Sequence, residues 1–187
     1  MTVTFPLTGE PLALDLLNTR TAAGDLVAGP EGLAAWLAVQ GGRLSPAGEV
    51  GEAEVAAVRA VREAARPALE AARRGERPPA QALAVLNGAL AAAPSHRVLE
   101  WTAGTGLTAD PHREAAAARR LAAELAEAVA DLLTDPRVTA VRACEAHDCV
   151  LLFLPAHPRR RWCVASVCGN RARVARYYAR HKEEPGA

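Results

Sequence analysis

Four cysteines in two evenly spaced pairs constrain the C-terminal part of this chain more than any other feature. Cys144 and Cys149 are separated by four residues, as are Cys163 and Cys168, and thirteen residues lie between the pairs. Two close pairs joined by a segment long enough for a hairpin can converge on one tetrahedral metal ion. A segment this short buries little core and needs such a cross-link to fold. The spacing therefore predicts a structural Zn²⁺ site made by all four cysteines.

Other uses of the thiols are compatible with the same residues. Disulfides need an oxidising compartment, but the N-terminal segment lacks the basic region and apolar core of a secretion signal. A catalytic thiol needs a base, for which His147 and His157 are candidates. Iron accepts the same four sulfurs. The paired spacing favours zinc in a closed site. Because no apolar run is long enough to span a membrane, we expect a cytoplasmic protein with no membrane contact.

The residues around the cysteines indicate how the metal module is built. Residues 150–154 (VLLFL) suit a strand, 155–158 (PAHP) a turn, and 159–163 (RRRWC) a second strand that carries the third ligand. Residues 168–181 are typical of a helix that begins at the fourth ligand. A knuckle, a hairpin and a ligand at a helix start together predict a treble-clef-like zinc module.

Charge is unevenly divided along the chain. The net charge is +1, but residues 1–136 hold 12 basic and 17 acidic side chains, whereas residues 137–187 hold 10 and 4. Lys182 is the single lysine against 21 arginines, so the placement of an arginine is more informative than its identity. Basic residues that surround a rigid module are typical of contact with nucleic-acid phosphates. The candidates for binding double-stranded DNA are Arg159, Arg160, Arg161, Arg171, Arg173, Arg176 and Arg180.

The terminal helix should have two different faces. Arg173, Arg176 and Arg180 recur at helical spacing on one side, with Tyr177 beside them, while Val174, Tyr178 and His181 form a second stripe that we expect to pack. Two alternatives to DNA binding remain open here. The charges can form a solvated face, or the helix can dock onto an acidic protein surface, for instance that of residues 1–136.

The N-terminal part reads as a mainly α (α+β) domain over residues 1–136, followed by the zinc module over 137–187. We expect Trp36 and Trp101 in the core. Gly51 is a candidate break and Pro67 a candidate kink in the longest helical segment. A Gly104-Thr105-Gly106 turn indicates a β-hairpin. The expected helices cover residues 11–20 (also compatible with a strand), 29–42, 45–74, 80–93 and 111–134, with the hairpin at 95–110.

Polar residues in the first predicted helix are a weak candidate for ligand binding. Asp15, Asn18 and Thr19 share one side at three- and four-residue spacing. They can line a pocket for a small-molecule effector or the active site of an enzyme, but hydrogen bonding to neighbouring backbone is the simpler role. No Ser/His/Asp set or carboxylate pair stands out, so we expect a protein that is not an enzyme.

The quoted motifs resemble a known family. Cys168-Gly169-Asn170-Arg171, preceded by RRRWC and the first cysteine pair, is similar to the CGNR zinc finger, and residues 12–20 (LALDLLNTR) resemble the start of the ABATE domain that usually precedes it. The resemblance implies a bacterial transcription regulator with four cysteines on zinc, a finger that contacts DNA and a stress-related N-terminal domain. A turn in this family often carries an Asp and a Ser or Thr where this chain has LPAHP (154–158).

A single small module contacts only a limited area of DNA, on the order of 600 to 1,000 Å². Specific binding is therefore expected to need a homodimer or further contacts from residues 1–136.

Overall fold

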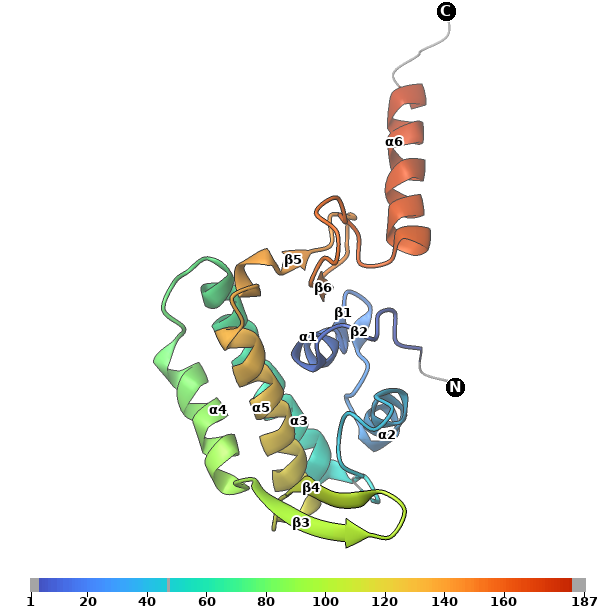
Figure 1. Ribbon diagram of the computed structural model, residues 1–187. Coiled ribbons are helices and arrows are strands. Elements are labelled where there is room, and N and C mark those ends of the chain that lie inside the picture. The colour runs from blue at the N-terminus through green and yellow to red at the C-terminus, as the bar shows by residue number, and fades with distance from the viewer. Residues whose placement is uncertain (1–3, 47, 183–187) are drawn as a thin grey trace, which may run out of the picture.

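Three helices, α3 (Glu52–Arg73), α4 (Ala80–Ala92) and α5 (Ala117–Thr134), pack side by side around the main core (Figure 1). The computed structural model describes residues 4–46 and 48–182. Apolar side chains recur every three or four residues along α3 and α5, so each helix turns one apolar stripe toward the other. The mainly helical N-terminal domain is thus confirmed. The buried stripes consist of Val55, Val58, Val61, Ala65, Ala68 and Leu69 on α3, and Leu121, Leu125, Val129 and Leu132 on α5.

Helix α3 begins at Glu52 and not at Ser45. Gly51 is its extended N-cap residue, and the Gly51 N–H donates to the Glu54 carboxylate at 2.9 Å, which satisfies a backbone group at the helix start. Pro67 lies within the helix without ending it. The predicted break at Gly51 is therefore the true start of the helix.

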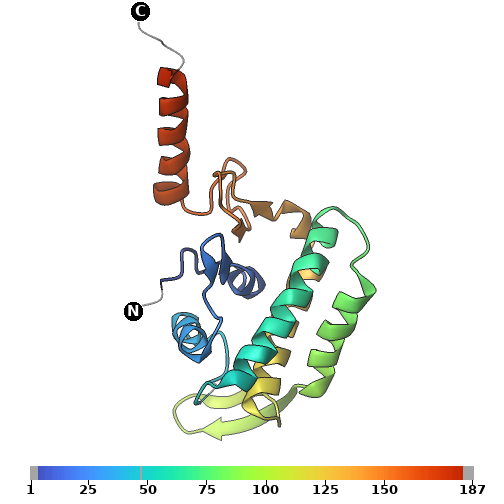
Figure 2. The same cartoon turned by 180° about the vertical axis from the view of Figure 1, so that it is seen from behind.

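The N-terminal segment lies beside α3 and α5, on the side away from α4 (Figure 2). α1 (Leu12–Leu17) is a helix, and it contacts α3 and α5. Leu14, Leu16 and Leu17 are all buried, because protein surrounds this short helix on most sides. The short strands β1 (Arg20–Thr21) and β2 (Gly24–Asp25) follow, and α2 (Pro30–Val39) buries Leu33 and Trp36 against the core.

The predicted hairpin is present, but its second strand ends at His112, two residues beyond the predicted end. β3 (His96–Thr102) pairs antiparallel with β4 (Gly106–His112), with His96 opposite His112 and Trp101 opposite Leu107. Pro111 and His112 are therefore strand residues, and the prediction that a helix begins at Pro111 is wrong, because α5 begins at Ala117. The ladder with β3 overrides the helix-start signal, and a proline is tolerated because both strands are at an edge.

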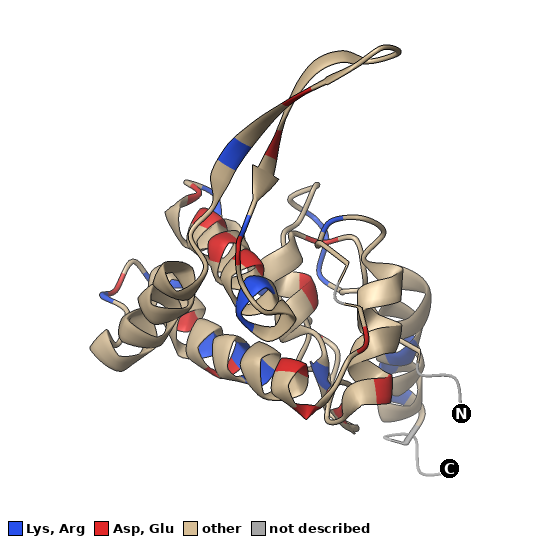
Figure 3. Cartoon of the chain, turned by 90° about the horizontal axis from the view of Figure 1, so that it is seen from below, with Lys and Arg blue, Asp and Glu red and all other residues tan. Residues whose placement is uncertain are grey.

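Trp101 is 75% exposed, so its expected place in the core is also wrong, whereas Trp36 is buried as predicted. Trp101 belongs to β3, and the β3–β4 hairpin extends beyond the helices (Figure 3).

The C-terminal part contains little regular structure before its last helix. A 3-10 turn (Val138–Ala140) leads to β5 (Arg142–Ala143), which pairs antiparallel with β6 (Leu152–Phe153). The expected pairing of residues 150–154 with 159–163 is wrong, because residues 159–163 form no strand. They bond instead to the turn between the first two cysteines, where the Glu145 N–H donates to Arg161 O at 3.1 Å. A π-helical turn (Ala165–Gly169) then leads into α6 (Asn170–Lys182).

Helix α6 points away from the rest of the protein (Figures 1 and 2). The side chains of Val174 and Tyr178 are 53% and 65% exposed, so the expected packed stripe is wrong. Among the described elements, α6 makes an extensive contact with the π-helical turn alone. Among the described residues, no helix combines the length and the apolar character that crossing a membrane requires.

Candidate metal centre and basic helix

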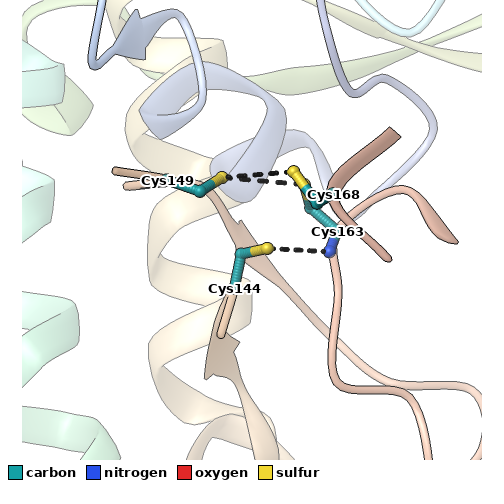
Figure 4. A group of neighbouring side chains, drawn as sticks. All are labelled: Cys144, Cys149, Cys163 and Cys168. Atoms are coloured by element: carbon teal, nitrogen blue, oxygen red, sulfur yellow. Dashed lines mark hydrogen bonds between the residues drawn. The ribbon is translucent and has the colours of Figure 1, made fainter. Parts of the chain in front are cut away.

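The four cysteine sulfurs gather at one point in the C-terminal part (Figure 4). Their Sγ atoms all lie within 4.8 Å of one another. The Sγ of Cys163 is 3.5 Å from that of Cys168 and 3.8 Å from that of Cys149, and the Cys168 and Cys149 sulfurs are 3.8 Å apart. A tetrahedron with Zn–S bonds of about 2.3 Å has edges of roughly 3.8 Å. The set therefore fits a four-cysteine metal site of the size that Zn²⁺ takes.

Local backbone geometry brings each sulfur to this point. The first pair lies on a tight turn in which the Cys149 N–H donates to Ala146 O at 3.2 Å and Asp148 takes a left-handed conformation with φ of 62°. The Cys144 N–H donates to Leu151 O at 2.9 Å, which closes the turn onto β6. Cys168 lies in the π-helical turn before α6.

Donors around the cluster stabilise thiolates. The backbone N–H of Cys163 points at the Cys144 sulfur at 3.4 Å, and Nη2 of Arg171 donates to the Cys168 sulfur at 3.1 Å. Burial, the largest single influence, acts to raise the pKa of Cys168, but the hydrogen bond from Arg171 and the contacts from the other three cysteines together outweigh it and lower that pKa. Such outer donors tune and orient metal ligands.

Two other thiols have raised pKa values, with burial as the main cause. The pKa of Cys149 is raised to about 11, and that of Cys163 is raised still further. Four thiolates at this spacing therefore require a cation to balance their charge. The side chain of His147 is 92% exposed, and its Nδ1 contacts the Asp148 carboxylate at 2.7 Å.

The Cys-Gly-Asn-Arg stretch has a packing role at each position. The ring of Trp162 lies over Gly169, where an added Cβ would be 3.4 Å from a ring carbon. The Asn170 side chain donates to Ser166 O at 2.6 Å, and Arg171 contacts the Cys168 thiol as described. Trp162 and Gly169 thus pack closely at the base of α6.

Three of the seven arginines predicted to bind DNA are engaged with protein groups. Arg160 pairs with Glu10 at 2.8 Å, donates to Cys163 O at 2.7 Å and lies over the Phe153 ring at 4.4 Å. Arg161 pairs with the Glu145 carboxylate at the surface. Arg171 donates to the cluster.

The other four arginines point outward. Arg159, Arg173, Arg176 and Arg180 are exposed, and none forms an ion pair with a carboxylate of residues 4–46 and 48–182. Arg176 and Arg180 contact only backbone carbonyls of α6 itself, and Arg173 bonds Asn170. Arg173, Arg176, Tyr177 and Arg180 line one shallow hollow along α6.

The metal module is fixed to the N-terminal domain by side chains from α1 and the segment before it. Asn18 donates from Nδ2 to Leu152 O and accepts the Leu152 N–H on Oδ1, both at 2.8 Å. Glu10 accepts the Leu154 N–H at 2.9 Å and pairs with Arg160. Sequence reasoning missed Glu10, because its partners lie 144 and 150 positions away and no local pattern connects them.

Asp15 is likewise occupied by protein groups. It accepts the N–H groups of Gly9 and Glu10 and pairs with Arg43 at 2.6 Å. Burial raises its pKa, although the Arg43 hydrogen bond opposes the shift. Thr19 donates to Leu16 O at 2.6 Å. Asp15 and Thr19 thus bond backbone groups close to them in the sequence, whereas Asn18 bonds the distant Leu152. A cavity of about 400 Å³ is lined by three of the cysteines and by residues such as Leu26 and Val164, but not by Asp15 or Asn18.

Replacement of Asn18 by alanine is expected to destabilise the junction between the two parts by about 3 kcal/mol, because it leaves the Leu152 N–H and C=O buried and unpaired. Chemical denaturation of the zinc-loaded chain measures this cost. Asn87, which is exposed on α4, provides the matched control. Equal stability of Asn18→Ala and Asn87→Ala would contradict the assignment.

Two family models match the chain. The ABATE model, described as "Putative stress-induced transcription regulator", covers residues 10–136, and the CGNR zinc finger model covers residues 140–181. No curated protein matches the chain. The first match spans more than half of the sequence, and the second contains all four cysteines and most of α6. The chain therefore belongs to the ABATE family and carries a CGNR zinc finger after its ABATE domain.

Proposed function

We propose that this protein is a transcription regulator that binds double-stranded DNA through α6. The proposal depends on the basic composition and the solvent exposure of that helix. It has 13 residues, of which five are basic and none acidic, and it extends into solvent. The family description supports the regulatory role.

The zinc site would hold this helix in place. Cys144, Cys149, Cys163 and Cys168 are the residues that would bind Zn²⁺, which supplies a cross-link between the turn and the start of α6. Two contacts then fix the base of the helix: Arg171 to the Cys168 sulfur and Gly169 to the Trp162 ring. Because these groups are at the base, the arginines farther along α6 are free to meet a ligand.

The dimensions of α6 suit a DNA groove. A helix of 13 residues is about 20 Å long, and the major groove, about 12 Å wide, accepts an α-helix. Arg173, Arg176 and Arg180 lie on one face, from which guanidinium groups can bond phosphates or guanine. The rival role, docking of α6 onto the acidic N-terminal domain of the same chain, has no support in the described contacts.

Substitution of Arg173, Arg176 and Arg180 together by alanine is expected to flatten the salt dependence of DNA binding. Each phosphate contact contributes about −0.9 to the slope of log K against log salt concentration, so loss of three contacts should change the slope by roughly 2.7. Fluorescence anisotropy with a labelled duplex at several salt concentrations measures this slope.

The matched control removes the same charge elsewhere. Arg74, Arg77 and Arg119 are exposed in the N-terminal domain, so their joint replacement by alanine should leave the slope unchanged. An equal effect of both triple variants would show that only overall charge matters. Absence of any binding at low salt would overturn the proposal in favour of a protein partner.

The finer parts of the proposal follow from the same role. We place the protein in the cytoplasm of a bacterium, with a binding role and no catalytic one. Selection of bound fragments from random DNA tests whether binding is sequence-specific.

A further inference from the structure

The β3–β4 hairpin has one apolar face and one polar face. Side chains alternate across a strand, and partners in the register share a face. The pairs Leu99–Ala109 and Trp101–Leu107 therefore lie on one side of the hairpin. The pairs on the opposite side are His96–His112, Val98–Asp110, Glu100–Thr108 and Thr102–Gly106.

The apolar face is open to solvent. The exposed fractions are 67% for Leu99, 75% for Trp101 and 64% for Leu107. Neither strand makes an extensive contact with any helix or with another sheet in the described part of the chain. Figure 3 shows the hairpin reaching beyond the helices. Three large apolar side chains gathered on one face mark an interaction surface.

A hairpin with no support is only marginally stable in water, so its apolar face needs a cover whenever the protein is folded. A second copy of the chain is always available for this purpose, and most soluble assemblies are symmetric homo-oligomers. We propose that the apolar face of β3–β4 packs against the same face of a second copy.

The face is complementary to itself in shape. A two-fold axis that passes between the Leu99–Ala109 and Trp101–Leu107 pairs sets Trp101 against Leu99 of the partner subunit. The same axis sets Leu107 against Ala109 of the partner subunit, a large side chain against a small one. This arrangement would place the small Ala109 side chain opposite a larger leucine and avoid placing two small side chains together.

Charge on the face does not oppose this arrangement. Its one charged residue is Arg97, which donates from Nε and Nη2 to Ala109 O of its own hairpin, at 3.2 and 2.7 Å. The same two-fold axis keeps the two Arg97 side chains at opposite ends of the interface. No like charges are therefore brought together.

The size of the face determines how stable the dimer is. Seven residue pairs at about 3.3 Å per residue give a surface roughly 23 Å long and two strands wide. That is smaller than the roughly 800 Å² per partner of a standard interface. We expect a dimer that dissociates in the micromolar range, and its formation does not depend on whether α6 binds DNA.

Sedimentation velocity of the zinc-loaded full chain without DNA, from about 1 to about 200 μM, tests the surface. The wild-type protein is expected to shift from monomer to dimer within this range. The variant with Leu99→Thr, Trp101→Thr and Leu107→Thr should weaken the dimer at least about tenfold, because threonine keeps the strand preference and removes the apolar area. A wild-type chain that stays monomeric throughout overturns the proposal.

The opposite face provides the matched control. Glu100→Thr with Asp110→Thr should keep the wild-type dissociation constant, and equal weakening by both variants would mean that the hairpin face is not the interface. Tryptophan emission of the wild-type chain gives a second measurement that does not depend on any variant. Trp36 is already buried, so covering Trp101 should move the emission to shorter wavelength as dimers form. Dimers that form with unchanged emission would use another surface and contradict the proposal.

Discussion

Chelation of zinc is expected to unfold the C-terminal module while the N-terminal helices stay folded. A structural zinc typically contributes about 10 to 16 kcal/mol of apparent binding free energy in small fingers. The module has little to replace that contribution, because three of the six residues in its buried apolar cluster are the cysteines Cys144, Cys163 and Cys168 themselves. Hydrogen exchange before and after chelation should show loss of protection in β5, β6 and α6, with α3 and α5 still protected.

A single ligand substitution should reproduce most of this effect. Cys163→Ser removes one thiolate and leaves the three other sulfurs without a complete site, so the purified variant should hold less than one zinc per chain. Val167→Ser is the control, since Val167 is 59% exposed in the π-helical turn that carries Cys168. Full protection of α6 in metal-free wild-type protein would contradict a structural role for zinc.

The metal cluster was predictable because its signal is local. Two pairs of cysteines at equal spacing carry the information in their own sequence, and the structure brings all four sulfurs together. The helices with strong apolar periodicity, such as α5, were predictable for the same reason. The contacts of each arginine were not predictable from the sequence. Arg159 and Arg160 are neighbours in a run of three arginines, yet Arg160 pairs with Glu10 whereas Arg159 is exposed.

Errors arose where long-range contacts decided the local structure. Asp110-Pro111 is a good helix start, but the partner strand β3 continues to His96 and holds both residues in β4. β6 pairs with β5, which precedes it by about ten residues. A prediction that pairs residues 150–154 with a segment later in the chain therefore misses the true partner. Trp101 was placed in the core because large aromatic side chains are usually buried. Its exposure is the observation on which the dimer proposal depends.

The junction between the two parts has a consequence for function. Asn18 and Glu10 attach β6 and Arg160 to the N-terminal domain, and Val141 and Leu152 belong to its apolar core. The base of α6 is therefore held relative to the N-terminal domain. If two copies pair through their hairpins, the position of each α6 is set by that pairing, and the spacing of two DNA half-sites would follow from it.

Replacement of Asp25 by alanine is expected to be the most destabilising change in the N-terminal domain. Arg62 is 2% exposed and makes two hydrogen bonds to the Asp25 carboxylate, at 2.7 and 2.6 Å. Arg20 and Arg59 lie 3.6 and 3.9 Å from the same carboxylate. Loss of the carboxylate leaves the buried guanidinium with only the longer, 3.4 Å pairing to the exposed Glu63 carboxylate, and breaking a buried pair of this kind costs about 3 to 5 kcal/mol. Urea denaturation should show this loss, whereas Asp131→Ala, at an exposed site on α5, should change the free energy of unfolding by less than about 0.5 kcal/mol.

The same pair makes stability depend on pH in a predictable direction. The hydrogen bonds from Arg62 outweigh burial and lower the pKa of Asp25 in the folded protein. A carboxyl with a lowered pKa stabilises the fold above its unfolded-state pKa, about 3.9, and loses that contribution as the pH falls through its folded-state value. The difference in unfolding free energy between wild type and Asp25→Asn should therefore be constant near neutral pH and shrink below about pH 4. A difference that grows on acidification would mean that Arg62 does not hold Asp25 in its charged form.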